Sequence, residues 1–131
     1  MVKLGYTILY VSDVTKSIQF YEKAFGLERK FITPQHDYAE LLTGETTLSF
    51  ASRELANSNL PEGFIEANMQ AKPFGIEIGF ITNEIEEILE KAISAGATVV
   101  SPLTSKPWGQ QVVYLRDPDG FLIELCTTVP H

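Results

Sequence analysis

Tyr10-Val11-Ser12-Asp13-Val14 is followed 71 residues later by Ile81-Thr82-Asn83-Glu84-Ile85, and the two segments share one pattern. Each begins with the apolar end of a β-strand, continues with a polar pair of the kind that caps helices, and enters a helix with an apolar residue. Self-similarity at a long, constant spacing is typical of a duplicated structural unit. We therefore expect two similar modules in one chain.

The helices that follow the two segments are expected to end at Gly26 and Gly96, since glycine readily adopts the left-handed conformation at a helix C-terminus. The two glycines are 70 residues apart, so the copies keep register to within one residue. Apolar residues recur at helical spacing in both copies. They are Ile18, Tyr21 and Phe25 in the first and Ile85, Ile88, Leu89 and Ala92 in the second.

Three strands are expected after each helix. They cover about 27–33, 38–43 and 46–51 in the first module and about 97–101, 110–116 and 121–126 in the second. The last two strands of each module are joined by tight turns, Thr43-Gly44-Glu45 and Asp117-Pro118-Asp119-Gly120. Each module therefore reads strand–helix–strand–strand–strand.

We predict an α+β fold in which two βαβββ modules form a cupped, mostly antiparallel eight-stranded sheet, with the helices on its outer face. Module one covers about 4–51 and module two about 73–127, within a single domain, 1–131. The connection 52–72 is too apolar for a free linker and is expected to pack across the domain, with a short helical turn. The inner face of the cup is a natural place for a small-molecule site.

The composition excludes several classes of partner. The chain has 131 residues, 44% of them hydrophobic, and a net charge of −7 with only 10 Lys and Arg residues. No basic run is present for nucleic acid, and no apolar stretch approaches the ~18 residues of a membrane span. The one cysteine, Cys126, cannot form an internal disulfide, and residues 1–6 lack a signal peptide's apolar run. We expect a cytoplasmic protein that binds neither nucleic acid nor membrane.

Two carboxylates interrupt strands that are otherwise apolar. Glu124 lies in the strand 121–126, and Glu77 lies in an expected strand 74–81, on the same strand face as Gly79. Gly79 removes bulk and could leave room for a ligand. A buried carboxylate is costly unless it is paired, hydrogen-bonded or metal-bound. The alternatives are a partly wet face, where water or a lysine satisfies each acid, and a shared functional site.

Six segments together resemble the vicinal oxygen chelate superfamily: 6–13 (YTILYVSD), 17–21 (SIQFY), 26–27 (GL), 96–97 (GA), 108–109 (WG) and above all 116–125 (RDPDGFLIEL). This superfamily includes glyoxalase I, bleomycin-resistance proteins, fosfomycin-resistance enzymes and extradiol dioxygenases. The resemblance covers nearly the whole chain. It implies paired βαβββ modules, usually in a homodimer, and a divalent ion at the base of the cup in metal-dependent members.

The resemblance also implies a ligand set on the first and last strand of each module: Tyr6, Ser49, Glu77 and Glu124. Glu124 matches the family's usual acid, whereas the other three stand where histidine, glutamine or an acid is typical. Zn²⁺ and Ni²⁺ favour imidazole, which this set lacks, and Mg²⁺ or Mn²⁺ would be held weakly. Two possibilities therefore stay open. The protein binds a divalent ion (Mg, Mn, Ni or Zn) through Glu77 and Glu124, or it has no cofactor.

The resemblance leaves two functions open. In the first, a metal-assisted lyase or isomerase, similar to lactoylglutathione lyase, or a dioxygenase-type enzyme uses Glu124 or Glu77 as its catalytic base. In the second, the protein sequesters a cationic drug-like molecule without a metal, as bleomycin-resistance proteins do. Tyr6, Tyr10 and Trp108 would then contact the ligand by stacking, with Ser49 beside them.

The remaining reactive side chains are not expected to carry chemistry. His36 lies in the turn 34–37 and is expected to face solvent, and His131 is the terminal residue. Cys126 has no histidine near it in sequence and is expected to pack in the core.

Overall fold

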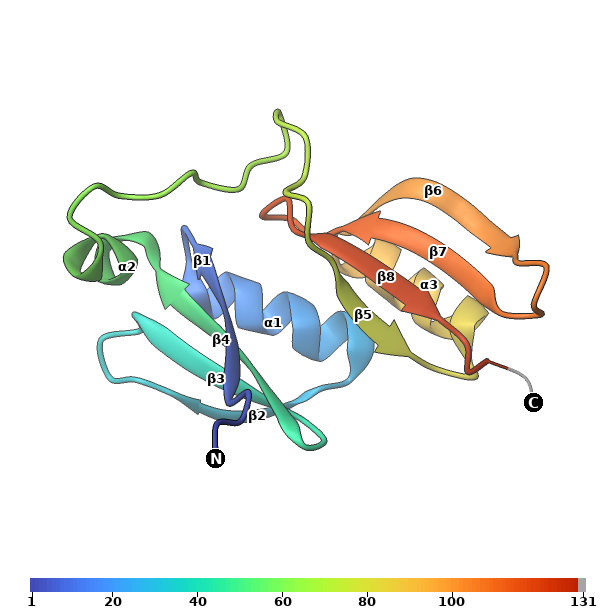
Figure 1. The fold of residues 1–131 in the computed structure, drawn as a ribbon, viewed down its shortest axis with the longest axis horizontal. Coiled ribbons are helices and arrows are strands. Elements are labelled where there is room, and N and C mark those ends of the chain that lie inside the picture. The colour runs from blue at the N-terminus through green and yellow to red at the C-terminus, as the bar shows by residue number, and fades with distance from the viewer. Residues whose placement is uncertain (130–131) are drawn as a thin grey trace. The chain divides into compact units, whose positions relative to one another are not determined.

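The computed structural model describes residues 1–129 and forms three helices and eight strands in that range (Figure 1). His131 lies outside the described residues. The helices are α1 (Val14–Phe25), α2 (Arg53–Asn59) and α3 (Ile85–Ala95). The strands are β1 (Tyr6–Val11), β2 (Glu28–Ile32), β3 (Tyr38–Thr43), β4 (Thr46–Ser52), β5 (Ile78–Ile81), β6 (Thr98–Ser105), β7 (Gln111–Arg116) and β8 (Leu122–Cys126).

The chain divides into two compact units, the first ending at Glu66 and the second beginning at Ala67. The boundary falls inside the connection expected at 52–72. Each unit contains one βαβββ module and is described by itself. The predicted α+β class and the repeated element order are confirmed, and the eight strands are hydrogen-bonded as two sheets of four.

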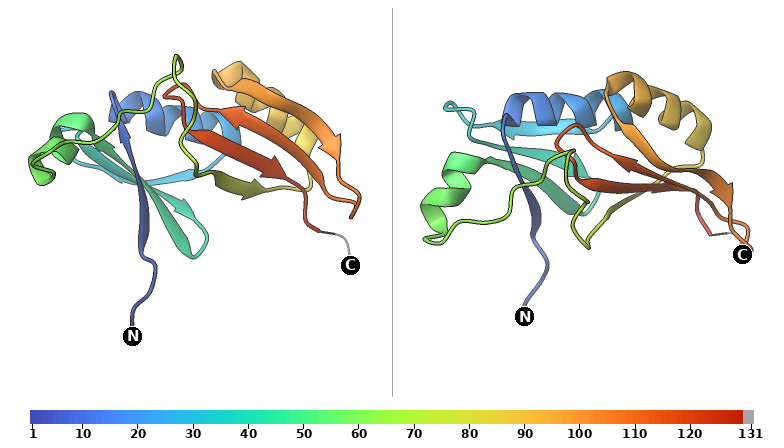
Figure 2. Two further views of the ribbon diagram at one scale, coloured as in Figure 1. Left: turned by 45° about the horizontal axis from the view of Figure 1, so that its top comes forward. Right: turned by 90° about the horizontal axis from the view of Figure 1, so that it is seen from above.

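In the first unit the strand order is β1-β4-β3-β2, with β1 parallel to β4 and the other pairs antiparallel. Helix α1 lies over one face of this sheet, as both views of Figure 2 show. Asp13 caps the helix by accepting a hydrogen bond from Lys16 N at 3.1 Å, and Gly26 ends it at φ 67°. The Tyr21 ring meets Phe50 of β4, with centroids 5.2 Å apart, so the core lies between helix and sheet.

The second unit repeats this arrangement with the order β5-β8-β7-β6 and α3 against β8 (Figure 1). Its turn after β7 is tied to residues 67–72 by Arg116, whose guanidinium donates to the carbonyls of Gly120, Ala71 and Asn68. Gly120 has a φ of 102°, and a Cβ there would lie 2.8 Å from the Asn68 carbonyl carbon. The turn therefore requires glycine for both its conformation and its close approach.

Three boundaries differ from those expected. The connection contains α2, a full helix capped by Ser52, whose Oγ accepts from Leu55 N at 3.1 Å. Strand β5 begins only at Ile78, which pairs with Ile123 of β8, so most of the expected strand 74–81 precedes the ladder. Strand β6 continues to Ser105 through Pro102, which an edge strand tolerates since its missing N–H is not needed by a neighbour.

Candidate functional site

Each sheet has one face covered by its helix, and the opposite face, called here the open face, carries every predicted site residue that lies in a strand. In the second unit Ile123 and Leu125 are buried on the α3 side, so Glu124 between them points to the open face. In the first unit Phe50 is buried on the α1 side, and its neighbour Ser49 points to the open face.

The open face of the second unit brings Glu77 and Glu124 together. Gly79 is the Cα partner of Glu124, and a Cβ added to Gly79 would lie 3.6 Å from Glu124 Oε2. Glu77 is two residues before Gly79 and immediately before β5, so its side chain projects on the same side. Across the sheet, Tyr114 of β7 is in register with Glu124 and donates from its hydroxyl to Oε1 at 3.3 Å.

The charges of this pair are not balanced by a cation. The pKa of Glu77 is raised above 4.5, first by desolvation and then by the negative charge of Glu124. Among residues 1–129, no Lys, Arg or His side chain forms an ion pair with either carboxylate. The pKa of Tyr114 is also raised, by burial and then by Glu124, so its hydroxyl stays a donor at neutral pH. The electrostatic potential at this face is therefore negative, which favours binding of a positive charge.

The end of β8 adds a sulfur, an amide and an aromatic ring to the same face. Cys126 is buried, as expected, and its Sγ lies 3.6 Å from the Phe80 carbonyl oxygen. Burial raises the pKa of its thiol, Glu124 raises it further, and a hydrogen bond with Gln110 opposes both effects. The Trp108 indole N–H donates to Gln110 Oε1 at 2.8 Å. Trp108 is thus connected to the open face through Gln110.

The open face of the first unit carries a different polar cluster. Ser49 is fully buried, and its Oγ lies 3.1 Å from the hydroxyl of Tyr38, which donates to Glu40 Oε2 at 2.7 Å. Burial raises the pKa of Tyr38 above 10.0, with the charge of Glu40 acting in the same direction. Lys30 Nζ lies 3.5 Å from Glu40 Oε1. The acid of this unit is therefore neutralised by a cation of its own unit.

Two predicted aromatic contacts also lie in the first unit. The Tyr6 side chain is 58% exposed at the start of β1. Tyr10 packs edge-on against Phe64, with ring centroids 4.9 Å apart, so part of its surface is covered by the segment that follows α2. The two residues share the open face but have different surroundings.

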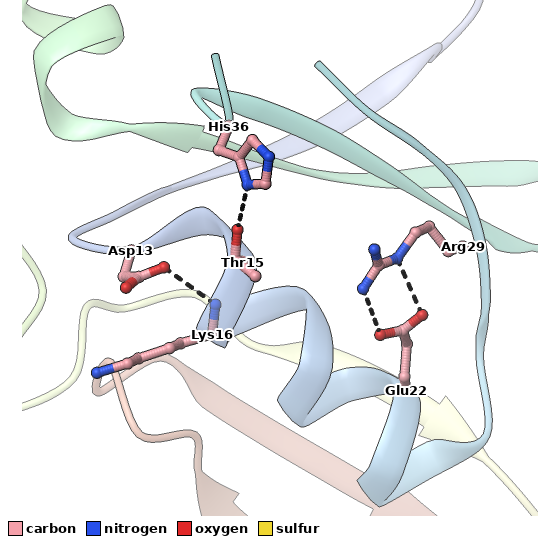
Figure 3. Close-up of polar contacts among 6 residues, drawn as sticks. All are labelled: Asp13, Thr15, Lys16, Glu22, Arg29 and His36. Carbon is pink, nitrogen blue, oxygen red and sulfur yellow. Dashed lines mark hydrogen bonds and ion pairs between the residues drawn. The ribbon is translucent and has the colours of Figure 1, made fainter. Parts of the chain in front are cut away.

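His36 is exposed, as expected, and is held at the start of α1. Its φ is 58°, and its ring Nδ1 lies 2.9 Å from Thr15 Oγ1 (Figure 3). The same helix carries the Asp13 cap and, at its other end, a paired Arg29–Glu22 contact at 2.9 Å. These contacts fix the helix and the turn, and none involves the open face.

Several polar residues of the two faces, among them Glu40, Tyr114 and Gln110, are not predicted from the sequence as site residues. Glu40 interrupts an apolar strand in the same way as Glu77 and Glu124, so that signal was available. Tyr114 and Gln110 carry no such signal, because a tyrosine within a strand or a glutamine beside one is ordinary. Their roles follow only from the register that places them beside Glu124 and Cys126.

The residues present do not fit a tightly bound divalent ion. No group of three or more His, Cys, Asp or Glu side chains within 1–129 is arranged to hold a metal. The second unit offers two carboxylates and the protonated hydroxyl of Tyr114, whereas hard cations take six or more oxygen ligands and Zn²⁺ prefers nitrogen or sulfur. In the first unit, Ser49 is already engaged by Tyr38.

None of the described helices has the length and apolar character needed to cross a bilayer.

Comparison with known proteins identifies the family. The model of the Glyoxalase/Bleomycin resistance protein/Dioxygenase superfamily matches residues 3–125. The chain is 28% identical over 120 residues to the uncharacterized protein YraH of Bacillus subtilis, covering 89% of this chain and 91% of that protein. It is 28% identical over 127 residues to a lactoylglutathione lyase of Neisseria meningitidis, covering 93% and 88%.

Solved structures agree in fold. A glyoxalase/bleomycin resistance protein/dioxygenase family enzyme from Burkholderia phytofirmans has a TM-score of 0.83 at 20% identity, covering 98% of this chain and all of that one. A glyoxalase-related enzyme from Fulvimarina pelagi has a TM-score of 0.80 at 18% identity, covering 98% and 89%. The resemblance inferred from the sequence is confirmed, and the chain belongs to the Glyoxalase/Bleomycin resistance protein/Dioxygenase superfamily.

Proposed function

We propose that the protein binds a small organic cation on the open face of its second unit, without a metal. Glu124 and Glu77 would supply the negative charge, and the Tyr114 hydroxyl would hold the Glu124 carboxylate in place. The observation that carries the proposal is the pairing of two carboxylates with no cation among residues 1–129 to neutralise them. A ligand ammonium or amidinium group would relieve their repulsion.

Net charge favours the same class of ligand. A chain with net charge −7 attracts cations and repels anions at long range. A glutathione adduct carries a net negative charge and would meet repulsion at Glu77 and Glu124. The Neisseria relative is named a lactoylglutathione lyase. For this chain, the charge favours sequestration of a basic molecule of the bleomycin type over an activity on a glutathione adduct.

A calorimetric titration tests this function. A panel of basic organic molecules, with bleomycin among them, is titrated at pH 7 in EDTA and again with Mn²⁺, Mg²⁺ or Ni²⁺. We expect a cation to bind equally well in EDTA. Glu124→Gln is expected to weaken binding about tenfold, the usual effect of losing one charge-assisted contact.

The matched control is the double variant Glu62→Gln, Glu90→Gln, which removes two exposed charges, one in the first unit and one on α3. This control variant changes the net charge by the same amount as the site variant Glu77→Gln, Glu124→Gln. Equal loss of affinity in both double variants would show that only net charge matters and would contradict the proposal. Binding that disappears in EDTA would instead support the metal-assisted alternative.

A second candidate function rests on the raised pKa of Glu77. A carboxyl group whose pKa is raised by burial and by a neighbouring acid is suited to proton transfer, as a lyase or isomerase requires. An assay for lactoylglutathione formation, with and without divalent ions, tests this candidate. Turnover that is lost in Glu77→Gln and retained in Glu90→Gln would favour it, and no turnover under any condition would remove it.

Two further expectations belong to the proposal. The resemblance implies a homodimer, which sedimentation would test, with a monomer at micromolar concentration as the contradicting result. A cytoplasmic setting suits a chain whose one cysteine is buried and reduced.

A further inference from the structure

Arg116 is the only basic residue in strands β5–β8, all of which the structure describes, and it lies on the same face as the acidic pair. Strand alternation places its side chain with that of Tyr114, on the open face. Leu122 is the register partner of Arg116, so Glu124 is its diagonal neighbour on β8. Diagonal neighbours in an antiparallel pair lie about 7–8 Å apart, which a long side chain can span. Arg116 is therefore the basic side chain of this sheet that could neutralise Glu124.

The guanidinium of Arg116 is bound by backbone carbonyls and forms no ion pair with Glu124. Its Nε donates to the Gly120 carbonyl oxygen at 3.0 Å, its Nη1 to that of Ala71 at 2.8 Å and its Nη2 to that of Asn68 at 2.9 Å. The side chain is buried, and these three partners are neutral oxygens. A carboxylate is a stronger partner for a guanidinium than a carbonyl. Displacing the carbonyls would therefore favour an ion pair with Glu124.

The Asn68 side chain shapes the turn that supplies two of these carbonyls. Its Oδ1 accepts hydrogen bonds from the backbone N–H groups of Gln70 at 2.9 Å and Ala71 at 3.0 Å. The Ala71 N–H also donates to the Asn68 carbonyl oxygen at 3.3 Å. An asparagine that bonds the backbone two residues ahead in this way stabilises a turn. Both carbonyls are thereby kept in position for Arg116.

We propose that Asn68 is a positioning residue of the cation site, because the turn that it stabilises withholds Arg116 from Glu124. With Arg116 engaged by the turn, the two acids stay unpaired and accept the positive charge of a ligand. With the turn loosened, Arg116 pairs with Glu124 and competes with that ligand. This inference rests on the proposed function and adds an internal competitor to it.

Titration of Asn68→Ala with 4-phenylbutylamine, in EDTA at pH 7, tests this role. Alanine removes both side-chain hydrogen bonds of the turn. We expect the affinity to fall about fivefold, the effect of a partly exposed ion pair that the ligand has to break. Asn68→Asp keeps an oxygen acceptor at the same position and should bind the amine at least as tightly as the unmodified protein does.

Asn59→Ala is the matched control. It removes the 3.4 Å hydrogen bond that an exposed asparagine of the first unit donates to the Leu55 carbonyl oxygen, and it should leave the affinity unchanged. A loss in this variant as large as that in Asn68→Ala would overturn the inference.

A second background separates competition from loss of structure. In Arg116→Met the competing charge is absent, so adding Asn68→Ala should leave the affinity unchanged. A fall of the same size in both backgrounds would mean that the turn affects the site without Arg116, and the inference would be wrong. Urea unfolding checks that each variant is folded before it is titrated.

An NMR measurement that needs no substitution at Arg116 keeps the test available if Arg116→Met does not fold. Arg29 and Arg53 are the other arginines of the chain, so Arg29→Lys and Arg53→Lys assign the side-chain Nε–H signal of Arg116. In Asn68→Ala we expect 4-phenylbutylamine to return this signal toward its position in the unmodified protein, because the amine displaces Arg116 from Glu124. A signal that does not respond to the amine in Asn68→Ala overturns the inference.

The outcomes also separate this inference from the proposed function. If Asn68→Ala binds the amine as tightly as the unmodified protein while Glu124→Gln binds it about tenfold more weakly, the cation site stands and the role of Asn68 is wrong. Failure of the amine to bind the unmodified protein overturns both.

Discussion

At the scale of residues, one lysine distinguishes the two open faces. Each unit places an acid and a hydroxyl opposite one another on neighbouring strands: Glu40 opposite Ser49 in the first, and Glu124 opposite Tyr114 in the second. Lys30 neutralises Glu40, whereas Glu124 has Glu77 beside it in place of a cation. The first acid has a cation of its own unit, whereas the second has no ion-pair partner within residues 1–129.

Glu77→Gln is expected to stabilise the protein at neutral pH. Because the pKa of Glu77 is raised above 4.5 in the folded state, ionising it favours the unfolded chain. The gain from glutamine should be absent below about pH 4.5, where the carboxyl is protonated in both states, and appear as pH rises through the raised value. Water screens this exposed group, so we expect a gain under about 1 kcal/mol.

Urea unfolding of Glu77→Gln and the unmodified protein at pH 4 and pH 7 measures this difference. Glu90→Gln, on the exposed side of α3, provides the control and should show no gain at either pH. A Glu77→Gln protein less stable than the unmodified one at pH 7 would mean that Glu77 has a stabilising partner.

At the scale of elements, the sequence predicts best where the signal is local. Both main helices begin and end where the capping residues and the glycines at 26 and 96 place them. The start of β5 and the length of β6 depend on which strand lies alongside, which a local pattern does not contain. For the same reason Glu77 and Glu124 could be found as acids in apolar strands, whereas Tyr114 and Gln110 could not.

The two helix starts should respond differently to mutation. Asp13 accepts a hydrogen bond from Lys16 N, whereas Glu84 at the equivalent position makes no side-chain bond to its helix. Asp13→Ala is therefore expected to lower stability by about 1 kcal/mol, as loss of an N-cap usually does. Glu84→Ala should change it by less than about 0.5 kcal/mol.

Thermal unfolding followed by circular dichroism measures both variants. Equal losses in Asp13→Ala and Glu84→Ala would contradict the assignment, because they would show that the two caps contribute alike despite their different contacts.

At the scale of the whole molecule, duplication has produced two modules of the same order with different chemistry. The family is clear from a match over residues 3–125. The sequence resemblance implies four ligand positions, at Tyr6, Ser49, Glu77 and Glu124. Only two of these are strong ligands for a metal, and both lie in the second unit. We therefore propose that the negative charge of the second unit binds the ligand.

The most direct test is to map a bound cation onto the chain. Backbone ¹H–¹⁵N spectra are recorded in EDTA while 4-phenylbutylamine is added to the ¹⁵N-labelled protein. The account predicts saturable shifts at Glu77, Gly79 and the β8 residues around Glu124, and their loss in Glu77→Gln, Glu124→Gln. Shifts confined to the strands around Lys30 and Glu40, or unchanged in that double variant, would contradict it.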